Sequence, residues 1–307
     1  MVAAVGSALD PARGRERMIE TVMLPAVLAL AMLGAGLDID LRRLPNGHIA
    51  ARTMFAGLVV TVILLPLAGL TIAACFRDEP AIAFGLALLA VSPAGLLAGP
   101  MASAAGGAAG TAVALTASSS LLYLAAAPRL IPALAIWFDV PAGTVDLPGR
   151  DILTGISAIC VLPLVVGAVI RLVAPCHARS SGRIIASLIR PLLGCVLTYI
   201  LIVNVDALWR CSAGLLGATL LLNLLAVLLA GGVAAVAACR PVDRLAIEGA
   251  CLIRQEGTGI FVAAVVFDET TAALPLIVNS VTALIVAHLL RSCRRSGRSS
   301  LAARATV

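Results

Sequence analysis

Three polar side chains interrupt a long apolar segment near the C-terminal end of the chain. Residues 245–267 are mostly apolar, and about 20 such residues form a helix long enough to cross a bilayer. Arg254, Gln255 and Glu256 nevertheless lie in the middle of this segment, and Gly257 follows them. A charged side chain at mid-depth is costly in hydrocarbon unless it faces protein or a polar cavity. The segment therefore predicts a broken helix, and broken helices mark the substrate or ion site in many transporters.

A second interruption lies in the apolar segment formed by residues 81–105, which contains Ser92-Pro93-Ala94-Gly95. Proline removes a helical hydrogen bond and glycine loosens the backbone, so we expect this helix to break there as well. Hydroxyl groups follow in the next segment at Thr116 and at Ser118–Ser120. We expect the two breaks to meet, which brings together these candidate substrate-binding residues: Ser92, Pro93, Gly95, Thr116, Arg254, Gln255, Glu256 and Thr258.

Arg254 carries the most specific chemistry in this set. A guanidinium stays charged at any accessible pH and can bind a carboxylate or sulfonate through two parallel hydrogen bonds. We expect it to be paired with Glu256. Two alternatives stay open: the pair can be purely structural and hold the broken helix, and Thr116 can serve helix–helix hydrogen bonding instead of a ligand.

The composition identifies an integral membrane protein. Of the 307 residues, 61% are hydrophobic and 12% are charged, whereas soluble domains carry about twice that charged share. The basic residues are all arginine, and aromatic residues are too few to form a stacking platform, so we expect no nucleic-acid partner. The cysteines are scattered without a C-x-x-C pair, and the three histidines lie near the ends of apolar segments. The sequence therefore predicts neither a disulfide framework nor an intramembrane catalytic pair, and we expect no enzymatic activity.

The apolar runs predict an all-α protein with a transmembrane domain at residues 18–290. A polar segment at residues 1–17 precedes this domain. A basic, Ser-rich tail at residues 291–307 follows it, and we expect this tail to be disordered. The first run would also suit a signal peptide, but its length and lack of a cleavage motif favour a retained span. Nine spans are expected, at about residues 18–37, 49–75, 81–105, 111–134, 152–173, 184–205, 215–238, 245–267 and 272–290.

Alternate loops differ in their arginine content. The positive-inside rule favours an external N-terminus and a cytoplasmic C-terminus in the plasma (inner) membrane. The two interrupted segments are the second-last spans of the two halves of the chain. This placement predicts an inverted repeat of five plus five helices that lacks its first helix, with the two broken helices crossing at the substrate site.

Several short motifs occur in the order and spacing of a known family. Residues 28–37 read Leu-Ala-Leu-Ala-Met-Leu-Gly-Ala-Gly-Leu, Ser92-Pro93-Ala94-Gly95 matches a Ser/Cys-Pro-Gly-Gly break, and Gly106-Gly107 precedes Leu115-Thr116. Pro275-Leu276-Ile277 fits the start of the last span. Over residues 24–290 the sequence resembles the bile acid:sodium symporter family.

The resemblance implies a panel domain, formed here by spans one, five and six, and a core domain formed by the other spans. In this family, substrate binds between the two domains, near the crossed breaks of the core. The implied substrate is a small amphipathic organic anion, either bile-acid-like or another carboxylate or sulfonate. The resemblance also implies coupling to sodium.

The implied sodium ligands are mostly missing. Thr116 and Gln255 keep oxygen-bearing side chains at family ligand positions, so they form a vestigial sodium site. The other ligand positions are changed to Thr61, Ala98, Gly99, Ala112, Cys251 and Glu256. We therefore favour a sodium-independent carrier in which Arg254 replaces the mobile cation, or a carrier driven by protons through Glu256, with no other cofactor. The alternatives are an exporter of the auxin-efflux type and a non-transporting receptor or degenerate homologue.

Overall fold

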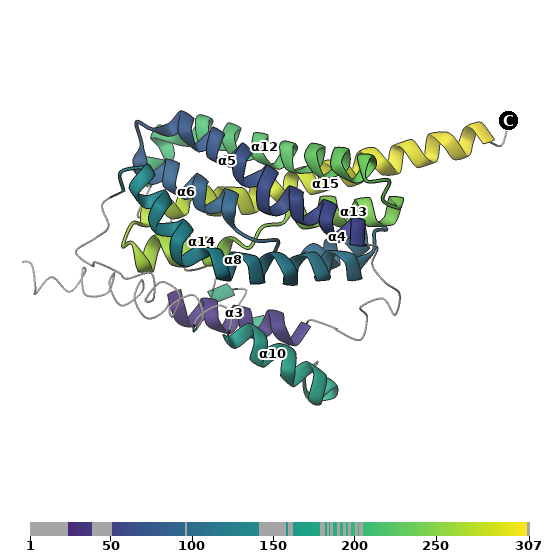
Figure 1. Ribbon diagram of the computed structural model, residues 1–307, viewed down its shortest axis with the longest axis horizontal. Coiled ribbons are helices and arrows are strands. Elements are labelled where there is room, and N and C mark those ends of the chain that lie inside the picture. Colours follow the sequence, from purple (N-terminus) through teal and green to yellow (C-terminus); the bar gives the residue numbers. More distant parts are fainter. Residues whose placement is uncertain are drawn as a thin grey trace, which may run out of the picture.

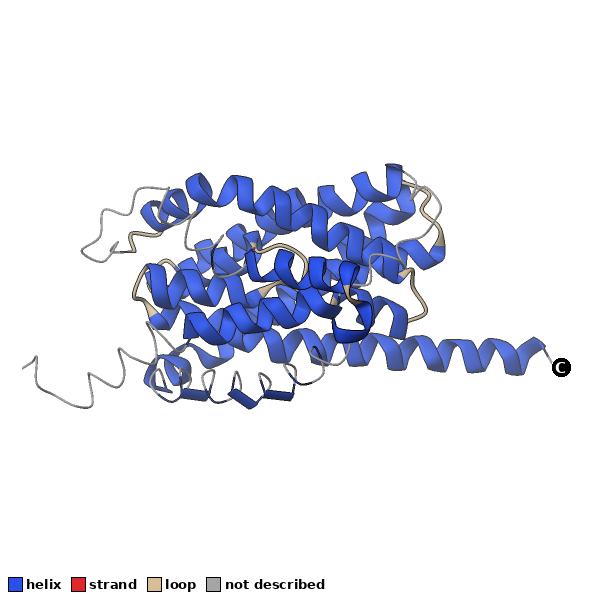
Figure 2. Ribbon diagram, turned by 90° about the horizontal axis from the view of Figure 1, so that it is seen from below, coloured by secondary structure: helices blue, strands red, loops and turns tan. Residues whose placement is uncertain are grey.

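A computed structural model of the protein describes residues 24–38, 51–95, 97–140, 162–178 and 205–305, together with residue 158 and scattered positions between residues 182 and 202. Within these residues the chain is helical and forms no strand (Figures 1 and 2). This architecture agrees with the all-α membrane protein expected from the sequence. The expected number of nine spans and the inverted repeat stay predictions, because parts of the chain lie outside the described residues.

The helices follow one another in this order: α3 (Leu24–Asp38), α4 (Ala51–Leu58), η3 (Val59–Leu64), α5 (Leu65–Ala73), η4 (Ala74–Phe76), α6 (Pro80–Val91), α7 (Ala98–Ala104), α8 (Ala109–Trp137), α10 (Leu162–Val173), α12 (Val205–Val236), α13 (Pro241–Leu252), α14 (Glu256–Phe261), η6 (Val262–Val266), η7 (Thr270–Ala273) and α15 (Leu274–Ala305).

Four of the described helical stretches are long and apolar enough to cross a membrane, judged by length and composition. They are Ala51–Phe76, Ala109–Trp137, Ala213–Val236 and Thr270–Ser292. The first of them runs without interruption through α4, η3, α5 and η4, with one turn of π-helix in its middle. The chain is therefore a multi-pass membrane protein.

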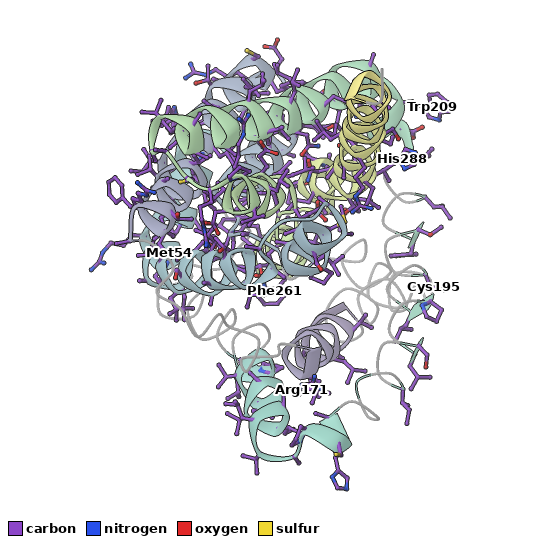
Figure 3. The ribbon with its side chains drawn as sticks, turned by 90° about the vertical axis from the view of Figure 1, so that its right-hand side faces the viewer. Met54, Arg171, Cys195, Trp209, Phe261 and His288 are labelled. Carbon is purple, nitrogen blue, oxygen red and sulfur yellow. The ribbon has the colours of Figure 1, made fainter. Side chains whose placement is uncertain are left out.

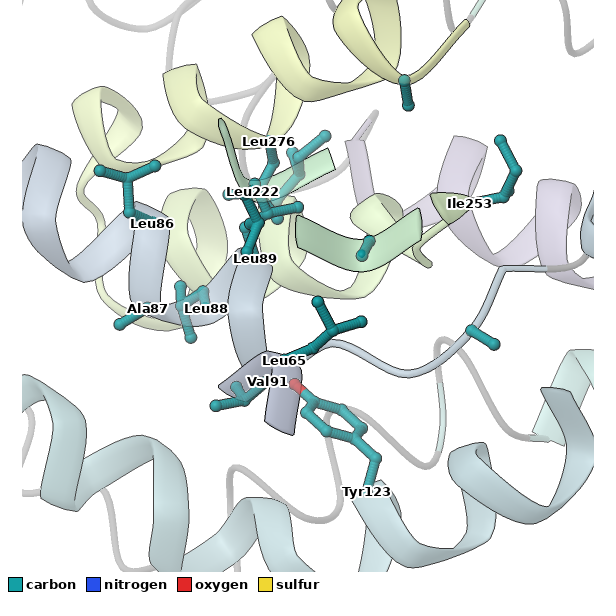
Figure 4. Close-up of a cluster of buried hydrophobic side chains, with 14 of the residues drawn as sticks. Leu65, Leu86, Ala87, Leu88, Leu89, Val91, Tyr123, Leu222, Ile253 and Leu276 are labelled. Atoms are coloured by element: carbon teal, nitrogen blue, oxygen red, sulfur yellow. The ribbon is translucent and has the colours of Figure 1, made fainter. Parts of the chain in front are cut away.

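Helix α6 lies at the centre of the main bundle. Its sequence is apolar on every side, and the ten residues from Ile82 to Val91 are all buried, as expected of a helix surrounded by others. Leu86, Leu88 and Leu89 of this helix belong to a buried hydrophobic cluster that also includes Leu222 of α12 and Leu276 of α15 (Figure 4). Small residues allow the neighbouring helices to approach closely: a Cβ atom on Gly85 would collide with the carbonyl oxygen of Ala272.

Helices α3 and α10 pack against each other beside this bundle (Figures 1 and 3). Gly167 of α10 lies directly on the backbone of α3, where a Cβ atom would meet the carbonyl oxygen of Leu33. Within the described residues, α14 is the element of the bundle that contacts α3 most. The resemblance assigns α3 and α10 to the panel domain. The third expected member of that domain, residues 184–205, lies largely outside the described residues.

Two expectations about helix ends need correction. Residues 206–214 were expected to form a loop, but α12 begins at Val205 and continues through them. Asp206 and Arg210 are spaced one helical turn apart, and polar residues at this spacing are compatible with a helix. The tail after Arg291 was expected to be disordered, but α15 continues to Ala305. This stretch has no proline and contains the helix-favouring sequence Leu-Ala-Ala-Arg-Ala at residues 301–305.

The close approach at Gly85 leads to a stability prediction. We expect Gly85→Ala to lower the free energy of unfolding by about 1–3 kcal/mol, because the added methyl group meets backbone atoms that cannot rotate away. Gly217→Ala is the matched control: nothing lies within 4 Å of its would-be Cβ atom, and alanine favours a helix. Thermal unfolding of both variants in detergent measures the difference. An unchanged melting temperature for Gly85→Ala would contradict the prediction. It would mean that α6 and η7 can move apart enough to fit a methyl group without loss of stability.

Candidate functional site

The two interrupted helices meet at their breaks through backbone hydrogen bonds. Helix α6 ends at Val91 and α13 ends at Leu252. Between the breaks, Ala94 and Arg254 form an isolated antiparallel bridge. The Gly95 amide donates to the carbonyl of Ile253 at 2.7 Å, and the Gln255 amide donates to the carbonyl of Pro93 at 2.9 Å. Each break thus satisfies backbone groups of the other, as hydrocarbon surroundings demand.

The first break follows from its proline. Ser92 has an extended backbone, with φ −58° and ψ 142°, because the residue before a proline is disfavoured in helical geometry. Gly95 then allows the close approach, since a Cβ atom there would lie 2.7 Å from the carbonyl oxygen of Arg254. The second break contains no proline. We infer that its extended geometry is maintained by the hydrogen bonds to the backbone of the first break.

Helix α8 contacts the first break through two side-chain hydroxyl groups. Thr116 Oγ1 lies 3.2 Å from the carbonyl oxygen of Gly95 and 3.0 Å from that of Ala112. The amide of Ala94 donates to Ser119 Oγ at 3.2 Å. Thr116 therefore contacts the break, as the sequence suggests, and it also bonds within its own helix. Ser119 is one of the three consecutive serines noted in the sequence, although it was not among the candidate substrate-binding residues.

Arg254 is buried, with 6% of its surface exposed. Its Nη2 atom donates to the carbonyl oxygen of Ala90 in the last turn of α6. The carbonyl end of a helix carries partial negative charge, so the guanidinium sits where a cation is stabilised. Its Nη1 atom is buried and has no hydrogen-bond partner among the described residues. The site thus contains a fixed cation with one free donor.

Glu256 does not form the direct ion pair with Arg254 that the sequence analysis expected. Its Oε1 atom accepts from Asn279 Nδ2 at 2.7 Å, and its Oε2 atom accepts from Ser280 Oγ at 2.5 Å. Asn223 Nδ2 of α12 in turn donates to Asn279 Oδ1 at 3.0 Å and to Thr282 Oγ1 at 3.1 Å. The carboxylate therefore faces α15, because Asn279 and Ser280 of that helix both donate to it.

This network of amide and hydroxyl groups was not among the residues predicted from the sequence. Asn223 and Asn279 lie within apolar spans, and buried amides at such depth usually have a specific partner. That signal was present in the sequence. Of the remaining predicted residues, Thr258 is buried on α14, and Ser92 Oγ donates to the carbonyl of Leu88 at 2.7 Å. Both lie next to the breaks, but the described contacts of Ser92 are those of a helix end.

Several positions of the sodium site that the resemblance implies carry no side-chain oxygen. Ala98, Gly99 and Ala112 have no side-chain oxygen. The Cys251 thiol lies 3.5 Å from Thr61 Oγ1, so these two changed positions contact each other. The carbonyl oxygens of Ala90, Pro93, Gly95 and Ile253 each accept a hydrogen bond within the protein. No group of three or more acidic, His or Cys residues able to hold a metal occurs in the described part of the chain.

The hydrogen bond from Ala94 leads to a prediction. We expect Ser119→Ala to destabilise the protein by about 1–3 kcal/mol, because it leaves a buried backbone amide without its acceptor. Ser118→Ala, a change at the partly exposed neighbouring position, is the control and should have little effect. Melting temperatures in detergent test this. Equal values for the two variants would mean that Ser119 does not hold the first break.

A comparison with known protein families identifies the family of this chain. The model of the sodium bile acid symporter family matches residues 25–230, which include the first break and helix α8 but end before α13 and the second break. No curated protein matches the sequence significantly. The match covers more than half of the chain, and it agrees with the resemblance stated from the motifs. The chain therefore belongs to the sodium bile acid symporter family.

Proposed function

We propose that this protein is a secondary transporter of a small organic anion, which binds at the crossing of the two breaks through Arg254. The observation that carries the proposal is the Nη1 atom of Arg254, a buried charged donor without a hydrogen-bond partner among the described residues. A buried charged donor left unsatisfied is costly. A carboxylate or sulfonate that reaches this atom would supply the missing acceptor and form a charge-assisted hydrogen bond.

The surroundings of the site favour an amphipathic anion. Arg254 follows Ile253 in the chain and binds the carbonyl of Ala90, next to Val91, and both Ile253 and Val91 belong to the buried apolar core. Helix α14, which starts directly after the second break, is also the element of the bundle that packs most on α3. A substrate held at the break would therefore lie close to the boundary between the bundle and the α3–α10 pair. Movement of one body against the other at such a boundary is the general basis of alternating access.

The proposal includes independence from sodium. The guanidinium of Arg254 binds the carbonyl oxygen of Ala90 at the carbonyl end of α6, where the helix dipole favours a cation. In a carrier of this kind, a mobile cation at the break would stabilise both the helix end and the bound anion. Arg254 supplies both effects as a permanent charge. The lost oxygen ligands at Ala98, Gly99 and Ala112 support the same conclusion.

Charge at the two ends of the bundle supports a cytoplasmic C-terminus. The start of α8 lies beside the start of α13, since the Ala108 amide donates to the carbonyl of Val242 at 2.9 Å, and Thr53 of α4 contacts Cys239. This end carries Arg52, Arg240, Arg244 and Arg291. The opposite end carries fewer arginines, namely Arg77, Arg129 and Arg210. By the positive-inside rule the arginine-rich end faces the cytoplasm.

Two other functions would use the same site. An exporter of the auxin-efflux type would carry the anion outward, and a receptor would bind the anion without moving it. Tracer flux of a bile acid such as cholate across proteoliposomes separates them: a carrier exchanges tracer across the bilayer, a receptor binds it without flux, and the favoured direction distinguishes uptake from export.

The role of Arg254 is tested by substitution. We expect Arg254→Gln to weaken cholate binding by about 30-fold or more, because truncating one partner of a buried charged pair costs about 2–5 kcal/mol. Arg254→Lys should restore only part of the affinity, since a single ammonium lacks the fixed fork with which the guanidinium binds Ala90 through one nitrogen and offers the other to the anion. Calorimetric titration in detergent measures both values.

The control for this experiment is Arg210→Gln, which removes an exposed arginine of α12 far from the breaks. It should bind cholate as the unchanged protein does. If Arg254→Gln also binds with unchanged affinity, the guanidinium is structural and the anion site lies elsewhere.

Sodium independence is tested without any substrate. A ligand that binds only the folded state at about 100 times its Kd stabilises that state by about 2.7 kcal/mol. We expect the melting temperature in detergent to stay the same when potassium is replaced by sodium at constant ionic strength. A rise specific to sodium would show that an ion site persists at the breaks and that the protein is a sodium symporter.

A further inference from the structure

Helix α15 continues well past the end of its apolar span. The span ends at Ser292, whereas the helix ends at Ala305, and its last turns project away from the bundle (Figures 1 and 2). The extension carries several arginines, and no acidic residue occurs after Glu269. These arginines are Arg291, Arg294, Arg295, Arg298 and Arg304.

The spacing of the first four arginines is helical. Positions 291, 294, 295 and 298 are related as i, i+3, i+4 and i+7, and residues at this spacing share one face of an α-helix. Seven residues rise by about 10 Å along the axis. This length is comparable to the headgroup region, which adds about 5–8 Å to each side of the hydrocarbon core. We call the four positions the arginine face.

The arginine face has no acidic neighbour on its own helix, because no acidic residue occurs within α15. Arg291 is the member whose side chain the structure describes, and its guanidinium lies against the sulfur of Met101, which is a weak acceptor. Glu248 lines the same small cavity between α7, α13 and α15. Its carboxylate, however, already accepts from Arg244 at 3.0 Å. Like charges one turn apart destabilise a helix, so the face needs an external anion.

We propose that the arginine face binds the phosphate headgroups of anionic lipids in the leaflet that adjoins the C-terminal end of the bundle. Clusters of basic residues directly after a membrane span attract anionic lipids, and a guanidinium matches a phosphate through two parallel hydrogen bonds. The face follows the hydrocarbon span without a gap, which places it at the depth of the headgroups. Arg52 adds positive charge at the same end of the bundle. This inference does not depend on the transported substrate.

Hydrogen exchange of the full-length protein tests the proposal. The protein is placed in nanodiscs of phosphatidylcholine alone, or of phosphatidylcholine mixed with phosphatidylglycerol, and amide exchange is followed over residues 291–305. We expect exchange there to be about tenfold slower in the anionic nanodiscs, because bound headgroups hold the helix closed. The difference should shrink as salt is added, since salt screens exposed charges.

Two triple variants separate the arginine face from a general effect of charge. Arg294→Gln, Arg295→Gln and Arg298→Gln together should abolish the difference between the two lipids. Arg77→Gln, Arg129→Gln and Arg210→Gln together remove the same charge at the opposite end and should keep it. Equal exchange in both lipids for the unchanged protein would overturn the proposal. So would equal protection by inorganic phosphate in phosphatidylcholine nanodiscs, which would show a free-anion effect instead of lipid binding.

Discussion

The structure depends on a short antiparallel contact between two broken helices in the interior of a membrane protein. Only two hydrogen bonds define it, from Gly95 to Ile253 and from Gln255 to Pro93. In hydrocarbon an open helix end would leave amides and carbonyls without partners, and each such group costs free energy. The breaks can exist because each one supplies the groups that the other lacks. Gly95 keeps the two backbones close enough for this exchange.

The two charged residues of the second break then connect the crossing to different helices. The guanidinium of Arg254 turns to the carbonyl end of α6, and the carboxylate of Glu256 turns to Asn279 and Ser280 on α15. Opposite charges that are neighbours in the sequence therefore have separate partners. A direct ion pair would have been a local structure within one break, whereas the observed arrangement joins the second break to two further elements. It also leaves one donor of Arg254 available at the crossing.

The contact between the two breaks does not require side-chain oxygens at the positions where the resemblance implies sodium ligands. The crossing is made of backbone groups, and those groups do not depend on the side chains at Ala98, Gly99 or Ala112. The family match covers the first break but ends before the second. The second break, which lies beyond the matched residues, contains Arg254 and Glu256.

Much of the site could be predicted from the sequence. The apolar composition requires a membrane protein, Pro93 requires a break after Val91, and a charged pair in the middle of residues 245–267 requires a second polar interruption. Thr116 was also expected at the crossing, and its hydroxyl contacts the first break. These features follow from the chemistry of single residues and their immediate neighbours.

The tertiary structure alone decided the partners of the buried charges. Arg254 and the carbonyl that it binds are 164 positions apart, and Asn223 and Asn279 are 56 apart. Such pairings depend on how the helices pack, and a sequence pattern carries no distance information of that kind. The same holds for the ends of α12 and α15, where residues that read as loop and tail are helical. By itself the sequence determined where the helices must break and which charges lie there, and the packing of distant helices decided what those charges contact.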